Sequence, residues 1–104
     1  MDIIPDKLDD QTVAIYLEIP GSKIVELQGY FELYEGIGIV RTLSVKKSLV
    51  CILTTVDMQN DCIELLNALR NNNGDNNIPW RAVARPDEET RELYHGYSKK
   101  GKEL

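Results

Sequence analysis

The order of periodic segments in this sequence predicts an α+β fold with the element order β-α-β-β-α-β. Four segments have the apolar pattern of strands, and in the clearest of them, residues 12–19, apolar residues recur with a period of two. Two further segments have apolar residues every three or four positions, which is typical of helices packed through one face. Clusters of Pro, Gly, Asn and Asp separate these segments, and 104 residues suit one domain.

The first half of the pattern is a strand followed by a helix. The strand over residues 12–19 ends at Pro20-Gly21, and Ser22 is expected to cap the helix with its hydroxyl. Gly36 is expected to end the helix in a left-handed conformation, as the C′ residue. The predicted buried face of this helix consists of Ile24, Leu27, Phe31 and Tyr34, widened by Val25 and Leu33.

The second half repeats the scheme after a hairpin. Strands are predicted over residues 37–43 and 48–56, and Asp57 is expected to cap the second helix. The Asn-rich run after this helix predicts a flexible loop, and residues 78–85 form the last strand. Pro79 indicates an edge position for that strand, because proline has no N–H to donate. The apolar face of the second helix consists of Met58, Cys62, Leu65, Leu66 and Leu69.

This order is the split β-α-β, or ferredoxin-like, plan: a four-stranded antiparallel sheet with both helices on one face. The first and third strands are then central, and the second and fourth are edges. We place the domain at residues 12–86, after an acidic leader (residues 1–11). A polar tail follows at residues 87–104, for which we expect a short helix and then disorder.

The third strand is apolar on both of its faces, although helices cover only one face of the sheet in this plan. We therefore predict an apolar sheet face that acts as an interface, and we assign Tyr16, Val50 and Ile52 to it. A homodimer, stacked on this face or joined through the edge of the second strand, is the favoured explanation. The C-terminal tail folding back, or a partly wet central strand, are the alternatives.

Composition excludes several classes of function. With 17 acidic and 12 basic residues the net charge is −5, which argues against nucleic-acid binding. The sequence shows neither a signal peptide nor an apolar run long enough for a membrane span. Cys51 and Cys62 form no C-x-x-C pair, so we expect reduced core thiols in a cytoplasmic protein, most simply a bacterial one.

No catalytic constellation is visible. His95 is the single histidine and lies in the predicted tail, and no nucleophile, metal-ligand cluster or phosphate-binding glycine motif accompanies it. We predict a non-enzymatic protein with no catalytic residues, no metal and no cofactor.

The crossover resembles the ACT domain, a regulatory module that binds amino acids. The resemblance rests on Glu18, on Pro20-Gly21, on Ile24 and on the Gly36-Ile37-Gly38-Ile39 entry to the second strand. Gly38 stands where that family has a polar Asn, and Glu18 replaces its commoner Asp. Small bacterial families of stand-alone ACT-like domains are also similar to this chain.

The resemblance implies a regulatory domain that binds a small metabolite of the amino-acid class or modulates a partner. A helix N-terminus can hold a carboxylate, and glycines allow close approach of the backbone. A pure interaction or homodimerisation module without a ligand, working through the apolar sheet face, is the alternative. The ligand site implied by the resemblance comprises Pro20, Gly21, Ser22, Ile37, Gly38 and Ile39.

Overall fold

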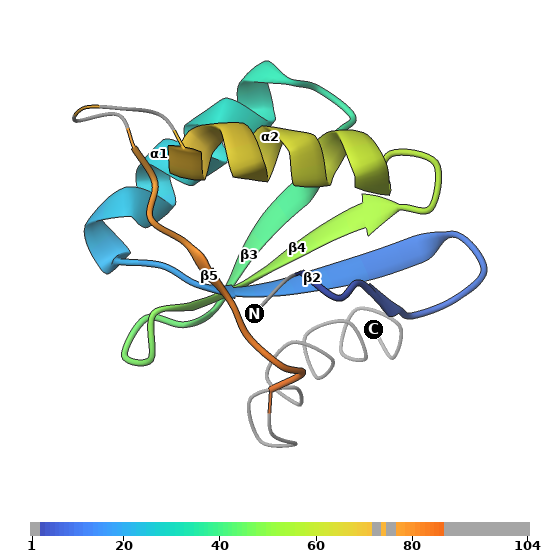
Figure 1. Ribbon diagram of the computed structural model, residues 1–104. Coiled ribbons are helices and arrows are strands. Elements are labelled where there is room, and N and C mark those ends of the chain that lie inside the picture. The colour runs from blue at the N-terminus through green and yellow to red at the C-terminus, as the bar shows by residue number, and fades with distance from the viewer. Residues whose placement is uncertain (1–2, 72–73, 75–76, 87–104) are drawn as a thin grey trace, which may run out of the picture.

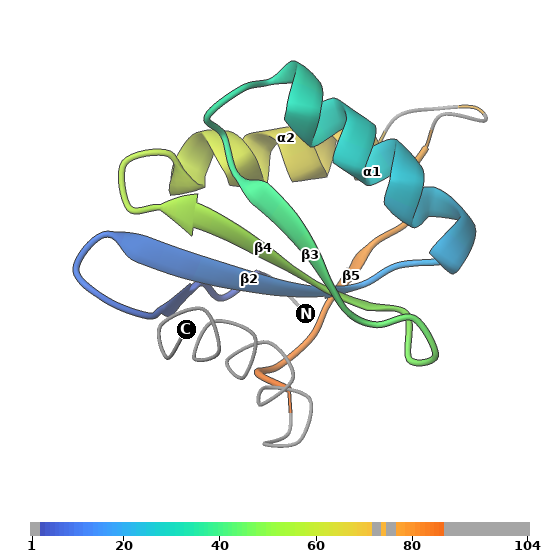
Figure 2. The same cartoon turned by 180° about the vertical axis from the view of Figure 1, so that it is seen from behind.

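The computed structural model describes residues 3–71, 74 and 77–86, and these form one antiparallel sheet with both helices on the same face (Figures 1 and 2). This confirms the α+β class, the predicted element order and its ferredoxin-like arrangement. The predicted tail, with its helix, its disorder and His95, lies outside the described residues. The elements are β1 (Asp6–Lys7), β2 (Thr12–Glu18), α1 (Gly21–Leu33), β3 (Ile39–Ser44), β4 (Leu49–Thr55), α2 (Gln59–Asn71) and β5 (Arg81–Ala82).

The centre of the sheet is the antiparallel pair β2–β4. Its register runs from Thr12 opposite Thr55 to Glu18 opposite Leu49. Strand β3 pairs with the far side of β4 and forms the end of the sheet, so the predicted central and edge positions of these three strands are confirmed.

The second edge of β2 is divided between two short strands. Strand β5 pairs with its end, at Leu17 and Glu18, and β1 pairs with its beginning, at Val13 and Ala14. The strand predicted over residues 78–85 is therefore only two residues long, and the acidic leader contributes a strand that the sequence pattern did not reveal. A two-residue strand cannot show a period, and the β1–β2 turn is instead shaped by the Asp9 carboxylate, which accepts two backbone N–H bonds.

Helix α1 differs from its prediction at both ends. It begins at Gly21 with Pro20 as N-cap and has no side-chain cap bond, so Ser22 is not the cap. Tyr34 is the C-cap, and Gly36 (φ 87°) lies in the turn beyond it, one residue later than expected for C′. On its face only Ile24, Leu27 and Phe31 are buried, whereas Val25, Leu33 and Tyr34 are exposed. The sheet covers only a narrow stripe of this helix, so the burial predicted for Tyr34 and for the widening residues Val25 and Leu33 was wrong.

Helix α2 follows its prediction more closely. Cys62, Leu66 and Leu69 are buried, and Met58 and Leu65 pack against them from partly buried positions. The hydroxyl of Thr55, in place of the expected Asp57 cap, accepts the N–H of Met58 at 3.1 Å just before the helix.

The main core lies between the sheet and the helices, and it contains Val50 and Ile52, both fully buried. Their assignment to the opposite face is therefore wrong: Ile52 lies opposite Ile15, and Val50 opposite Leu17, on the helix side. Tyr16 does face away from the helices, but it is only 4% exposed. We call its group the outer cluster, which consists of Ala14, Tyr16, Leu43 and Cys51.

Candidate functional site at the β2–α1 corner

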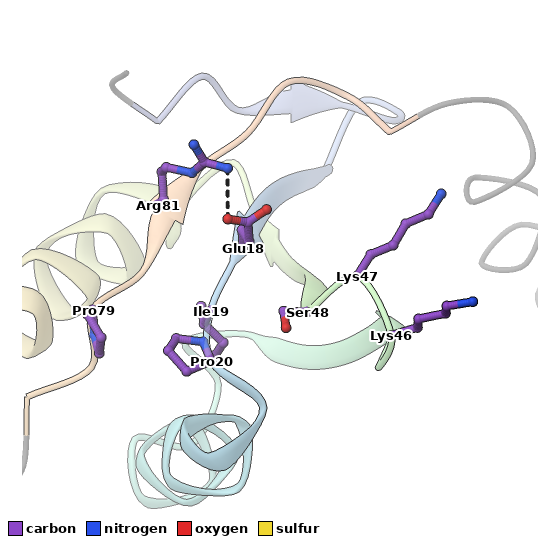
Figure 3. Close-up of a pocket in the computed structure, with 8 residues that line it drawn as sticks. All are labelled: Glu18, Ile19, Pro20, Lys46, Lys47, Ser48, Pro79 and Arg81. Carbon is purple, nitrogen blue, oxygen red and sulfur yellow. Dashed lines mark hydrogen bonds and ion pairs between the residues drawn. The ribbon is translucent and has the colours of Figure 1, made fainter.

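A depression of about 490 Å³ lies where β2 ends and α1 begins, and we call it the corner depression (Figure 3). Three parts of the chain form it: the β2–α1 link, the β3–β4 hairpin and the segment that leads into β5. Its lining residues are Glu18, Ile19, Pro20, Lys46, Lys47, Ser48, Pro79 and Arg81.

A backbone hydrogen bond joins the hairpin to the β2–α1 link, and further hydrogen bonds order the hairpin itself. Ser48 has a φ of 57°, and its carbonyl accepts the N–H of Ile19 at 2.9 Å. Within the hairpin, the N–H of Ser48 donates to the carbonyl of Val45, and the Ser44 hydroxyl accepts the N–H of Lys47. One wall of the depression is therefore ordered backbone that belongs to a strand connection.

The charged groups of the depression have both signs. Arg81 Nη2 lies 2.7 Å from Glu18 Oε1, an ion pair that joins β5 to β2 across 63 residues of chain. Both side chains are largely solvated, so the pair contributes little to stability and can exchange partners. Figure 3 shows Glu18 turned toward Arg81, while Lys46 and Lys47 extend from the hairpin away from this pair.

The start of α1 adds a weak positive potential to the same corner. The first turn holds no acidic residue, and Pro20 supplies no side-chain cap. The first N–H groups of a helix and its dipole favour an anion. The corner can thus attract a carboxylate, while Glu18 can accept a cationic group.

The six residues predicted as a ligand site do not converge within one chain. Pro20 lines the corner depression, and Gly21 and Ser22 are exposed in the first turn of α1. The 37–39 segment lies at the other end of the sheet, since Ile39 pairs with Leu53 whereas Glu18 pairs with Leu49. The prediction of a joint site is therefore wrong for a single chain.

Packing explains the 37–39 segment without a ligand. A Cβ on Gly38 would lie 3.1 Å from the Leu53 carbonyl and 3.2 Å from the Phe31 ring, so a side chain there would require the helix and sheet to shift by a few tenths of an ångström. Ile37 is buried, and its carbonyl accepts the Thr54 hydroxyl at 2.8 Å.

Sequence reasoning missed the contribution of Lys46, Lys47 and Arg81 to the site. The strand order could have predicted this contribution, because it places the hairpin and the end of the first predicted strand at the same end of the sheet. The pairing of Glu18 with Arg81 could not be predicted from the sequence pattern, because the two residues lie far apart along the chain.

Metal and thiol chemistry find no support in the described part of the chain. It holds no group of three or more His, Cys, Asp or Glu side chains able to bind a metal ion. Burial raises the pKa of Cys62 to about 12, and burial together with the nearby Asp6 carboxylate raises the pKa of Cys51 to about 12. Both thiols are therefore protonated and poor nucleophiles at neutral pH. No helix among the described residues has the length and hydropathy to cross a membrane.

The fold and the corner define the class of this molecule: an α+β domain of ferredoxin-like arrangement with a polar depression beside its first crossover. Residues 17–72, more than half of the chain, match the family model described as Domain of unknown function (DUF4911), and the chain belongs to this family. The matched segment contains Glu18, α1, the hairpin and α2, and it ends before Arg81. Searches of curated proteins and of solved structures gave no match.

Proposed function

We propose that this chain is a non-enzymatic, ACT-like regulatory domain that binds a small metabolite of the amino-acid class in the corner depression. The observation that carries the proposal is the pairing of opposite charges in one depression. A free amino acid has a carboxylate and an ammonium group on adjacent atoms, and the depression offers cations and a carboxylate among its lining residues.

The size and the charged lining of the depression support the proposal. The volume of about 490 Å³ is within the range of small-molecule sites. In the mode we propose, Glu18 binds the ammonium group of the ligand, and Lys46, turned inward, binds the carboxylate beside the α1 N-terminus. The buried, protonated thiols suit the reducing cytoplasm that we propose as the compartment, most simply in a bacterium.

A panel of amino acids screened by thermal shift tests the proposal. A ligand at about 100 times its dissociation constant stabilises the native state by about 2.7 kcal/mol, which raises Tm by about 10 °C for a domain of this size. Lys46→Ala should weaken binding severalfold. Lys7→Ala, which makes the same charge change on β1 outside the depression, should leave binding unchanged.

Homodimerisation without a ligand is the second candidate, and one observation favours it. Among the described strands none pairs with the outer edge of β3, and Ile39 there is 53% exposed. The bulge between Thr42 and Ser44 acts against such pairing. A flat thermal-shift panel from a protein with twice the mass of the chain would favour this candidate over the metabolite.

A further inference from the structure

Two segments from opposite ends of the described chain lie side by side along one edge of β2, next to the outer face of the sheet. Leu8, from the N-terminal segment, and Val83, from the C-terminal segment, both pack against the outer cluster. We call residues 4–8 together with residues 83–85 the terminal strap.

A single carboxylate joins the two halves of this strap to the sheet beneath them. The hydroxyl of Tyr16 donates to Asp6 Oδ2 at 3.1 Å, and Arg85 Nε lies 3.1 Å from the same oxygen. Tyr16 comes from the central strand β2 and is buried, so its hydroxyl needs a partner within the protein. Asp6 supplies that partner and at the same time holds Arg85.

The other attachments of the strap are few. Strand β1 makes two residue pairs with β2, the N–H of Leu8 donates to the carbonyl of Thr12 at 2.8 Å, and the N–H of Val83 donates to the carbonyl of Tyr16 at 3.1 Å. By contrast, seven residue pairs join β2 to β4. A hollow of about 220 Å³ also remains between the two segments, bounded by Ile4, Pro5 and Ala84 among others. Segments with short pairing and incomplete packing open at lower free energy than the core.

We propose that Asp6 is a clasp, and that its release lets both halves of the terminal strap leave the outer cluster together while the helix-side core stays folded. The strap is then a regulatory cover: closed, it hides the apolar outer face of the sheet, and open, it exposes that face. This inference stands independently of metabolite binding at the corner depression, which lies elsewhere on the molecule.

The two cysteines report on the two sides of the sheet. Cys51 belongs to the outer cluster and lies opposite Tyr16, whereas Cys62 belongs to α2 and the helix-side core. Both are buried in the closed structure, so a thiol reagent modifies them only after opening. The rate of iodoacetamide labelling of each cysteine, followed by mass spectrometry of peptides from the full chain, therefore measures the two openings separately.

Asp6→Asn removes the ionic half of the clasp, and Asp10→Asn makes the same charge change at an exposed position of the same segment. We expect Asp6→Asn to raise the labelling rate of Cys51 about tenfold while that of Cys62 changes less than about twofold. Asp10→Asn should change neither rate. Arg85→Gln leaves both the Tyr16–Asp6 bond and the Asp6 carboxylate that raises the pKa of Cys51, so a rise at Cys51 in this variant reports opening and not a more reactive thiol. It should give an intermediate rise at Cys51, and it also serves if Asp6→Asn fails to fold.

Two results would contradict the proposed role of Asp6. An equal rise at Cys51 and Cys62 would show that Asp6 stabilises the whole domain. An unchanged rate at Cys51 would show that Asp6 does not control access to the outer cluster.

Discussion

At the scale of single residues, Gly38 is explained by close packing, although it lies in a motif that resembles a ligand site. The Gly-Ile-Gly-Ile run resembles a ligand-binding entry to a strand, but the missing side chain at Gly38 is needed for the approach of Phe31 and β4. Its φ is not in the left-handed region, so the requirement is space and not backbone conformation. A glycine with surrounding space, such as Gly29, has no such requirement.

Alanine at these two glycines should therefore change stability in opposite directions. Gly38→Ala forces Phe31 or β4 to move and should lower the free energy of unfolding by about 1–3 kcal/mol. Gly29→Ala, on the exposed side of α1, should raise it by about 0.5–1 kcal/mol, because alanine is the better helix former. Urea unfolding of both variants measures the two effects. A neutral Gly38→Ala would contradict the packing explanation.

At the scale of elements, the β3–β4 hairpin owes its shape to one residue. Ser48 occupies the left-handed region (φ 57°), where a residue with a Cβ is strained, yet its carbonyl anchors the N–H of Ile19. The hairpin wall of the corner depression thus depends on a conformation that serine adopts at a cost.

The backbone strain at Ser48 predicts how the free energy of unfolding depends on the residue at this position. Ser48→Gly should raise the free energy of unfolding by up to about 1 kcal/mol, and Ser48→Val, with a branched Cβ, should lower it by about 1–2 kcal/mol. Lys46→Val places the same side chain in the same hairpin without a positive φ and should cost much less. Thermal unfolding of the three variants tests the series, and equal effects of the two valine substitutions would refute it.

Element patterns were predictable from the sequence where an element was long enough to repeat its pattern of buried residues. The face of α2 through Cys62, Leu66 and Leu69 followed from its spacing, as did the central strands. The prediction that further apolar residues of α1, such as Leu33, are buried was wrong, because apolar side chains also lie on exposed surfaces. Strand β1 was not predicted, and β5 was predicted to be longer than it is, because a strand with two residue pairs has no periodic pattern in the sequence.

At the scale of the whole molecule, the sequence could state which residues share a face of the sheet but not which face the helices cover. Alternation along β4 separates Val50 and Ile52 from Cys51 in either case, and only the contacts of α1 and α2 decide between the two. The same limit applies to the candidate site. Pro20 was correctly placed at a corner, but the partners of that corner, Lys46 and Arg81, depend on which loops meet at one end of the sheet.

The proposed binding of an amino-acid-class metabolite at the corner depression is tested most directly by amide NMR titration of the full chain with the strongest thermal-shift hit. We expect the largest chemical-shift changes at Glu18, Gly21, Ser22 and the hairpin, with smaller changes at Gly38 and Ile39 across the sheet. Glu18→Gln should weaken the changes while keeping their pattern. Shifts centred on the 37–39 segment or on the outer cluster, or no saturable shifts with any amino acid, would contradict the account.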